Sequence, residues 1–468
     1  MSDSRNSYLL KNTAIFTLGN LATRCIAFLL VPLYTNVLST SDYGTTDLIT
    51  TISTIAVPII TLNIMESVMR FNLDKGVDKN KITKIGIVIL CYGALIGLFV
   101  IPLASLWDRV SSYSVLIYFF VICSAASQVF LCDLRGKELL VHYSVGNILN
   151  TLLIAIFNIL FLVVFKWGVR GYLLAYTLAN GIVAIYALIV GKGYRAFSAS
   201  LDVERMKSML KYSTVLIPNS FMWWIMNSSD HVMVTSMIGI AANGVYAISY
   251  KFPSLITTVT GIFNQAWSYS AIREGDAEDL EKYTNNVFFS LRGVLFIIGI
   301  WMLTVLKPFL KWYVAEEYYE AWKYTPFLII GCVFLTMATF MSTSYTVHKD
   351  SKGFLISGTV GAMLNITLNF VLIPLIGVYG AATATCFSYV AVFVFRVIHT
   401  KKYMSYKVVD REFIIGTIGL LINSVLMFFD GFILQMCQLI IACYVTFLLK
   451  NAWEPFFMIA VKRTRKNK

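Results

Sequence analysis

Charged side chains are scarce in this sequence. Asp, Glu, Lys and Arg make up 13% of the 468 residues, about half of the roughly 25% that soluble domains carry. Hydrophobic residues make up 58%, and no long polar stretch separates them. These proportions exclude a soluble globular protein and predict a polytopic membrane protein. The apolar run after the polar segment Ser2–Lys11 is too long for a signal peptide and lacks a small-residue cleavage site.

Several functional motifs are also missing. The sequence has no glycine-rich phosphate loop, no Walker pattern and no H-E-x-x-H, so we expect no catalytic residues, no enzyme activity and no ATP hydrolysis. The eight cysteines lie in or beside apolar runs without metal-type spacing, which favours small core residues over a metal site or disulfides. The net charge of +13 is spread over short loops and forms no basic stripe, so no nucleic-acid partner is expected.

What the sequence does contain is a series of apolar runs long enough to cross a bilayer. A membrane core of about 30 Å needs about 20 helical residues. We predict an all-α fold of about fourteen transmembrane helices, at 12–38, 43–70, 82–106, 111–133, 140–165, 168–191, 211–237, 243–272, 285–306, 322–346, 352–375, 377–398, 412–429 and 432–450.

The distribution of Lys and Arg orients these spans. With the N-terminus in the cytoplasm, 29 of the 38 Lys and Arg residues fall on the cytoplasmic side and six on the opposite side. This asymmetry follows the positive-inside rule. We therefore expect a multi-pass protein of the cytoplasmic (inner) membrane with both termini in the cytoplasm. The external loops are all short, the longest running from about Lys307 to Lys323.

A weak internal repeat divides the predicted spans into two halves. We predict an N-lobe over 1–195, a cytoplasmic linker over 196–211, a C-lobe over 212–400, and a final helix pair with a basic cytoplasmic tail over 401–468. Parallel repeats of this kind support alternating access around a site near the bilayer midplane. The repeat rests on four matches: Leu10–Lys11 with Leu210–Lys211, Asp42–Tyr43–Gly44 with Ala242–Asn243–Gly244, Gly146 and Asn150 with Gly361 and Asn365, and Gly168–Val169–Arg170–Gly171 with Gly377–Val378–Tyr379–Gly380.

Ionisable side chains inside the predicted spans mark the candidate site. Arg24 lies in the middle of the first span, where a charge costs about 2.5 kcal/mol or more and therefore usually lines a polar cavity or pathway. The other candidates lie in spans two, seven, eight and nine: Asp47, Glu66, Asp230, His231, Lys251 and Arg292. Of these, Glu66, Asp230 and His231 are candidates for coupling to an H+ or Na+ gradient or to the membrane potential.

Structural roles for the same residues stay open. Asp47, Arg70 and Lys251 lie near span ends, where they can snorkel into the interface. Glu66 and Arg70 are four residues apart and can pair, and Arg292 can belong to a structural pair. Aromatic rings and amides near the charges are possible glycan contacts, although they also serve helix packing and the interfacial belt; they are Asn63, Trp223, Trp224, Asn227, Asn264 and Gln265.

Several segments distributed over nearly the whole chain form a recognisable set of motifs. They are Leu10–Lys11–Asn12, Gly19–Asn20, Phe28–Leu29–Leu30–Val31–Pro32–Leu33–Tyr34–Thr35, Asp42–Tyr43–Gly44, Phe263–Asn264–Gln265–Ala266–Trp267, Glu317–Tyr318–Tyr319–Glu320–Ala321 and Ile373–Pro374–Leu375–Ile376–Gly377–Val378–Tyr379–Gly380–Ala381–Ala382–Thr383–Ala384–Thr385. In these motifs the chain resembles bacterial flippases for polysaccharide repeat units, within the multidrug/oligosaccharidyl-lipid/polysaccharide superfamily.

The resemblance implies a two-lobe transporter with a cationic cavity. Its substrate would be an undecaprenyl-pyrophosphate-linked oligosaccharide for capsule, O-antigen or exopolysaccharide synthesis. Arg24 matches a basic position in span one of the related lipid II flippase, and Lys251 matches one in span eight more loosely; with Arg292 they are the candidates for the pyrophosphate. The implied partners are this lipid-linked substrate, membrane lipids, and the polymerase and glycosyltransferases of the pathway, with the chain acting as a monomer.

Two other functions remain open from the sequence. A multidrug or toxic-compound extruder of the same superfamily would be expected to have an acidic cavity, whereas basic groups here are at least as many as acidic ones. A membrane polymerase or glycosyltransferase usually has a sizeable external loop or a nucleotide-sugar domain, which the short loops do not provide.

Overall fold

The computed structural model describes residues 23–74, 76–107, 110–273, 280–348 and 350–454. Every regular element in these ranges is a helix, and no strand occurs in them, which confirms the predicted all-α fold. Packing divides the chain into two compact units. Unit 1 contains the residues up to Trp224 together with Gly239–Gly244, and unit 2 contains Ile225–Ile238 and the residues from Val245 onward.

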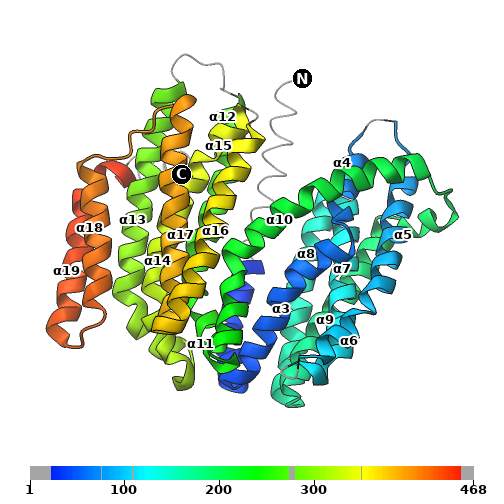
Figure 1. Cartoon of the computed structure of the whole chain (residues 1–468), viewed down its shortest axis with the longest axis horizontal. Helices are drawn as coiled ribbons and strands as arrows, with labels where there is room; N and C mark the ends of the chain where they lie inside the picture. The colour runs from blue at the N-terminus through cyan, green and yellow to red at the C-terminus, as the bar shows by residue number, and fades with distance from the viewer. Residues whose placement is uncertain (1–22, 75, 108–109, 274–279, 349, 455–468) are drawn as a thin grey trace, which may run out of the picture. The chain divides into compact units, whose positions relative to one another are not determined.

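Unit 1 is built from short and long helices that precede the division inside α10 (Figure 1). Its elements are α2 (Val31–Val37), α3 (Thr40–Ile60), α4 (Ile64–Asn72), α5 (Lys79–Gly97), α6 (Val100–Ser105), η1 (Ser111–Tyr113), α7 (Ser114–Gly136), α8 (Leu140–Asn158), the π-helix η2 (Ile159–Val164), α9 (Gly168–Val190), η3 (Gly193–Ser198) and the first part of α10 (Val203–Met237).

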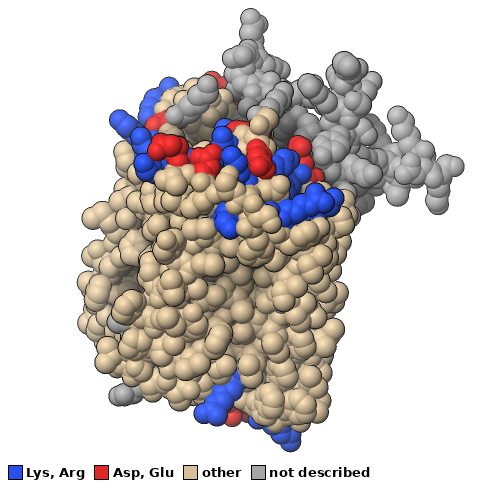
Figure 2. Space-filling model, turned by 90° about the vertical axis from the view of Figure 1, so that its right-hand side faces the viewer, with Lys and Arg blue, Asp and Glu red and all other residues tan. Residues whose placement is uncertain are grey.

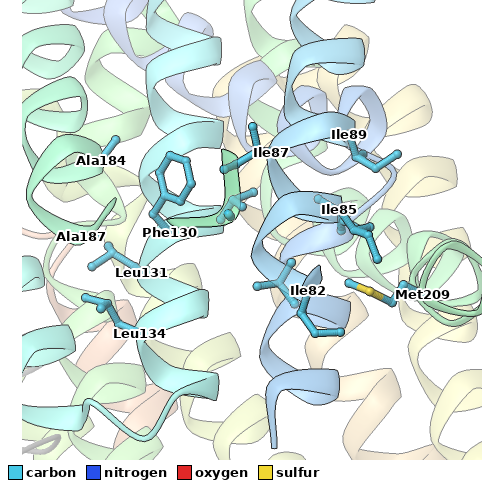
Figure 3. Packing of buried hydrophobic residues seen from close by; sticks show 14 of the residues in the cluster. Ile82, Ile85, Ile87, Ile89, Phe130, Leu131, Leu134, Ala184, Ala187 and Met209 are labelled. Atoms are coloured by element: carbon cyan, nitrogen blue, oxygen red, sulfur yellow. The ribbon is translucent and has the colours of Figure 1, made fainter. Parts of the chain in front are cut away.

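The core of unit 1 lies where α5, α7 and α9 meet the first turns of α10. Figure 3 shows residues of this cluster on α5 (Ile82, Ile85, Ile87 and Ile89), on α7 (Phe130, Leu131 and Leu134) and on α9 (Ala184 and Ala187). Met209 of α10 belongs to the same cluster and is fully buried. Burial of a side chain of this size stabilises the fold by roughly 1.5–3 kcal/mol. The predicted linker 196–211 therefore includes turns of α10 that pack on the core.

Unit 2 is formed mainly by long helices after the division. Its elements are the rest of α10, the end of α11 (Ile240–Ser249), α12 (Pro253–Arg273), α13 (Leu280–Tyr313), η4 (Glu316–Lys323), α14 (Thr325–Met341), α15 (Thr343–Val347), α16 (Ser351–Ile376), α17 (Val378–His399), η5 (Thr400–Lys402), α18 (Arg411–Leu426) and α19 (Phe432–Leu448). The last two helices pack against each other and against α13 (Figure 1).

Many of these helices are long enough to cross a membrane. Within the described residues, eight helices are long and apolar enough to cross a bilayer, and nine if α3 and α4 form one bent span. Thr23–Val37, Ile240–Ser249 and Phe432–Leu448 are shorter apolar helices. The protein is thus a multi-pass membrane protein, and the count of fourteen spans remains a prediction.

Two predicted spans are broken in the structure. The span predicted at 43–70 bends by 60° between α3 and α4, where Leu62 and Asn63 adopt left-handed backbone angles (φ 50° and 53°). The span predicted at 243–272 is divided into α11 and α12 just before Pro253. Proline lacks the amide hydrogen that a continuous helix requires. Breaks of this kind in transporters often expose backbone groups to a site.

Candidate functional site

A buried carboxylate on α10 is the centre of a hydroxyl cluster in unit 2. Asp230 is 1% exposed. Its Oδ2 accepts hydrogen bonds from the Tyr246 hydroxyl at 2.7 Å, the Tyr250 hydroxyl at 2.5 Å and Thr385 Oγ1 at 3.0 Å. The three donors come from α11, from the break after it and from α17. Tyr246 and Tyr250 are four residues apart, so one helical face directs both rings to the same oxygen.

A second layer of polar side chains supports this cluster. Asn365 on α16 donates to Thr385 Oγ1 at 3.2 Å and to Ser388 Oγ at 3.4 Å. Its carbonyl oxygen accepts from Ser229 Oγ at 3.3 Å and from Asn369 Nδ2 at 3.0 Å. The Oδ1 atom of Asn369 is buried and has no hydrogen-bond partner among the described residues. One acceptor oxygen near the cluster is therefore left for a donor or a cation.

His231 lies beside the same two tyrosines. Its ring centroid is 5.2 Å from that of Tyr246 and 5.1 Å from that of Tyr250. Its backbone N–H donates to Asp230 Oδ1 at 3.0 Å. The His231 ring therefore lies next to the two tyrosines that bond to Asp230, its neighbour in the sequence.

The cluster has the chemistry of a site for a proton or a small hard cation. A buried carboxylate is costly unless it is hydrogen-bonded, protonated or paired with a cation. No lysine or arginine in the described part of the chain forms an ion pair with Asp230. The surrounding groups are hydroxyl and amide oxygens, which suit Na+ as well as a transferable proton. The described residues contain no group of three or more His, Cys, Asp or Glu side chains that would form a metal centre.

Sequence reasoning missed most of the residues that complete this cluster. Tyr246 and Tyr250 could not be distinguished from the other tyrosines, because the chain has 26 of them. A single sequence does not show that their hydroxyls bond to Asp230 on α10. Weak signals existed for the others. Asn365 is one of the repeat matches, and Thr385 ends the motif that resembles the flippases.

The repeat partner of Asn365 occupies a comparable place in unit 1. Asn150 on α8 donates to Asn180 Oδ1 at 2.8 Å, and Asn180 donates to Ser124 Oγ at 3.2 Å. Both asparagines of the repeat therefore bond to the helix that follows them, α9 and α17 respectively. The unit 1 network has only neutral members among these contacts, so the carboxylate makes the unit 2 cluster the candidate ion site.

The predicted pyrophosphate residues lie in three different settings. Arg24, in the apolar helix Thr23–Val37, is exposed, and no carboxylate of the described residues pairs with it. Lys251 is half-buried at the break between α11 and α12. Neither cation forms an ion pair among the described residues.

Arg292 has a different environment. It is 1% exposed in α13, and its guanidinium donates to Asp410 Oδ2 at 2.5 Å and to the carbonyls of Val408 and Lys407 at 2.6 and 3.2 Å. The rings of Phe288, Phe289 and Phe413 lie within 5.8 Å of its Cζ atom. These contacts hold the segment before α18, which favours the structural alternative for Arg292.

Glu66 and Asn63 lie close to the bend in unit 1. Glu66 is half-buried in the first turn of α4. Its possible partner Arg70 pairs with Asp74 instead, at 2.6 Å. Asn63 is 2% exposed, and its Oδ1 has no partner among the described residues. The Glu66–Arg70 pair considered from sequence spacing does not form.

The remaining candidates for glycan contact are divided between the units. In unit 1, Trp223 is half-buried and Trp224 Nε1 donates to the Thr51 carbonyl at 2.9 Å. In unit 2, Asn227 Oδ1 accepts from the Tyr389 hydroxyl at 2.9 Å, and Asn264 Oδ1 is buried without a partner among the described residues. The side chain of Gln265 lies outside the described residues.

The described residues form a helical, multi-pass membrane protein with a buried polar cluster. A search of solved structures finds a similar fold in a lipid II flippase, MurJ, in an inward closed conformation, with a TM-score of 0.69, 12% identity and coverage of 96% of this chain and 100% of that one. A mutant of the Vibrio cholerae MATE transporter VcmN is also similar, with a TM-score of 0.59, 14% identity and coverage of 86% and 97%.

The family follows from the sequence match. Residues 9–269 match the model of the polysaccharide biosynthesis protein family, and the chain belongs to that family. An uncharacterized membrane protein of Methanocaldococcus jannaschii is 23% identical over 428 residues, which cover 85% of this chain and 99% of that protein. The predicted resemblance to polysaccharide biosynthesis proteins is confirmed as membership of that family, and the fold is shared with the lipid II flippase MurJ and with a MATE transporter.

Proposed function

We propose that this protein is a flippase that moves an undecaprenyl-pyrophosphate-linked oligosaccharide repeat unit from the cytoplasmic to the outer leaflet. The family match over residues 9–269 carries the proposal, and the fold shared with a lipid II flippase supports it. In this proposal the chain acts by alternating access, as a monomer and without catalysing a reaction. It lies in the cytoplasmic membrane with both termini inside, and serves a polymerase and glycosyltransferases of a capsule, O-antigen or exopolysaccharide pathway.

Binding of the substrate head group is assigned to unpaired cations. A pyrophosphate is doubly charged or more, and an arginine fork matches phosphate oxygens in geometry and charge. Arg24 is exposed on an apolar helix, and Lys251 lies at a helix break. Arg292 is omitted from this assignment because Asp410 and two carbonyls already occupy its guanidinium.

Energy for transport is assigned to an ion that exchanges at Asp230. Binding of a proton or Na+ neutralises the carboxylate and frees the Tyr246, Tyr250 and Thr385 hydroxyls to reorient. Those hydroxyls belong to α11, the adjoining break and α17, so ion occupancy would change how these elements are held relative to α10.

The function is tested with Arg24→Ala in the native host. We expect loss of surface polysaccharide and accumulation of lipid-linked precursor, with normal amounts of the variant in the membrane. Arg170→Ala is the control, because Arg170 is also exposed but lies on the predicted external side. Normal polymer with Arg24→Ala would contradict the head-group assignment. Drug resistance on overexpression, with unchanged surface glycan, would instead identify an extruder.

The coupling ion is tested in proteoliposomes with a labelled lipid-linked oligosaccharide. Asp230→Asn keeps the size of the side chain and one acceptor oxygen, replaces the other oxygen by an NH2 donor, and removes the charge and the group that can exchange a proton. We expect the variant to lose the dependence of transport on an imposed gradient. Separate H+ and Na+ gradients then distinguish the two ions, and transport by the wild type that ignores both gradients and the membrane potential would contradict coupling.

A further inference from the structure

The segment between α9 and α10 has two distinct faces. Gly193 and Ala196 of η3 are buried, and Ala196 belongs to the core cluster of unit 1. Tyr194 and Phe197 point away from that core and are 51% and 57% exposed. Because the buried residues fix the turn on the core, the two aromatic rings are presented at defined positions on the outside of unit 1.

Basic side chains lie among these exposed rings. Lys192 and Arg195 are exposed. Lys84 on α5 is half-buried, donates to the Phe197 carbonyl at 3.2 Å and lies 6.0 Å from the Phe197 ring centroid. We call Lys84, Lys192, Tyr194, Arg195 and Phe197 the aromatic–basic surface.

Three carboxylates after α4 and at the start of α10 are paired with other cations. Their ion pairs are Asp202 with Arg205 at 3.6 Å, Glu204 with Lys207 at 3.1 Å, and Asp74 with Arg70 at 2.6 Å. Within the described ranges, neither Lys192 nor Arg195 forms an ion pair. These two exposed cations are therefore available for an anionic ligand.

We propose that the aromatic–basic surface binds the head groups of anionic phospholipids. Figure 2 shows Lys and Arg gathered with Asp and Glu at one end of unit 1, next to a broad band without charged side chains. The η3 segment follows α9, which is long and apolar enough to cross a bilayer, and precedes α10. Tyrosine and phenylalanine at that depth anchor in the interface, while lysine and arginine reach the lipid phosphates.

A soluble partner fits the same observations less well. The exposed apolar side chains Leu201 and Val203 follow Phe197 along the chain and continue the apolar face toward α10. A rim of apolar side chains beside unpaired cations is the pattern of a surface that enters the head-group region. The inference is independent of the transported substrate and of the ion at Asp230.

Native mass spectrometry of the full chain tests the proposal. Delipidated protein is titrated with phosphatidylglycerol or phosphatidylcholine of identical acyl chains, at two salt concentrations. We expect the wild type to retain phosphatidylglycerol preferentially, and Lys192→Gln/Arg195→Gln to weaken that binding by about an order of magnitude or more. Higher salt should weaken the wild-type preference as well, since exposed charges are screened.

A matched double variant controls for the loss of two charges. Lys166→Gln/Arg170→Gln removes two exposed cations on the predicted external side and should leave phosphatidylglycerol binding unchanged. Phe197→Ala should weaken binding of both lipids, because it removes apolar contact without charge. An equal loss in both double variants, or a wild type that does not distinguish the two lipids, would overturn the proposal. Transport assays on each variant show that the protein remains folded.

Discussion

Gly44 in α3 and Gly244 in α11 cross at their backbones. A Cβ atom at Gly44 would overlap the Ile240 carbonyl, and one at Gly244 would overlap the Thr40 carbonyl. Asn243 beside the crossing donates to the Gly44 carbonyl at 3.2 Å and to Asp47 Oδ2 at 3.1 Å. Both helices reach this contact with their first turns, and all of these residues belong to unit 1.

Substitution at this crossing should separate the two helices. We expect Gly44→Ala and Gly244→Ala each to lower stability by about 1–3 kcal/mol, the usual cost of overpacking, as measured by thermal unfolding in detergent. Gly358→Ala in α16 is the matched control, because nothing lies within 4 Å of a Cβ atom there and alanine favours a helix over glycine. If all three variants unfold alike, the close approach of the backbones does not matter for stability.

The crossing involves two segments that the internal sequence repeat had matched. Asp42–Tyr43–Gly44 and Ala242–Asn243–Gly244 were matched only because they recur at a constant offset. The structure brings the two glycines of that match into contact. Hydropathy was sufficient for the helical fold, because lipid requires every backbone group to be satisfied within a segment. The orientation inferred from the Lys and Arg asymmetry stays a prediction. The breaks at Leu62–Asn63 and before Pro253 were not predicted, because proline position alone does not distinguish a kink from a divided helix.

Asp133 and Lys137 form a buried ion pair in unit 1. Their side chains are 3% and 9% exposed, and they meet at 2.6 Å. Asp133 also accepts from Asn72 and Thr83 at 2.9 and 2.7 Å, and Lys137 donates to the Gly191 carbonyl at 2.8 Å. This network joins the ends of α4, α5, α7 and α9.

Removing one partner of this pair should lower the free energy of unfolding more than removing both. Lys137→Met leaves a buried, uncompensated carboxylate, so we expect a loss of about 3–5 kcal/mol of unfolding free energy. Asp133→Leu/Lys137→Met removes both charges and should recover part of that loss. Equilibrium unfolding of the single and double variants provides the comparison. A double variant less stable than either single variant would show that the hydrogen bonds to Asn72 and Thr83 dominate.

The left-handed backbone angles between α3 and α4 predict that glycine has opposite effects on stability at the bend and within the neighbouring helix. Leu62 has φ of 50°, which costs a non-glycine residue roughly 1–2 kcal/mol. Leu62→Gly should therefore be neutral or stabilising, whereas Leu62→Val should destabilise because a branched Cβ tolerates this region poorly. Ile59→Gly, at an exposed position within α3, should destabilise by about 1 kcal/mol. A loss of stability with Leu62→Gly would contradict the left-handed backbone conformation at Leu62.

Candidate site residues were predicted by charge and depth, and these assignments stay predictions. The criterion selected Asp230 and His231, but it could not select the tyrosines that bond to Asp230, since tyrosine is common throughout the chain. It also selected Arg292, whose partner Asp410 is 118 positions away in sequence. Ionisable residues in spans are expensive whether they bind substrate or hold the fold, so depth alone does not separate the two roles.

Arg292 should therefore behave as a residue that stabilises the fold. Arg292→Gln leaves Asp410 and two carbonyls without their donor, and we expect a loss of about 1–3 kcal/mol, reduced at Asp410 because that side chain is 37% exposed. The folded fraction should bind substrate as the wild type does. Binding of lipid-linked substrate to purified protein, measured below the unfolding temperature, checks this. Weakened substrate binding with unchanged stability would contradict the structural role and would instead support Arg292 as a ligand of the head group.

Asp350 should confer a pH dependence on the stability of unit 2. Its carboxylate caps α16 by accepting from the Gly353 N–H at 2.9 Å, and it also accepts from the Tyr403 hydroxyl at 2.8 Å and from Lys402 Nζ at 3.0 Å. These three bonds hold the pKa of the Asp350 carboxyl well below its usual range, and the bond from the Gly353 N–H has the largest effect.

A carboxyl whose pKa is lower in the folded state stabilises the fold above its unfolded pKa of about 4, and loses that contribution as the pH falls further. Asp350→Asn should therefore unfold at a lower temperature than the wild type at pH 7 and pH 5. The difference should begin to shrink between pH 4 and pH 3, because in this range the Asp350 carboxyl takes up a proton in the unfolded chain while it stays ionised in the folded protein. Thermal unfolding of both proteins across this range measures it. A difference that stays constant from pH 7 to pH 3 would show that the Asp350 carboxylate does not titrate differently in the folded protein.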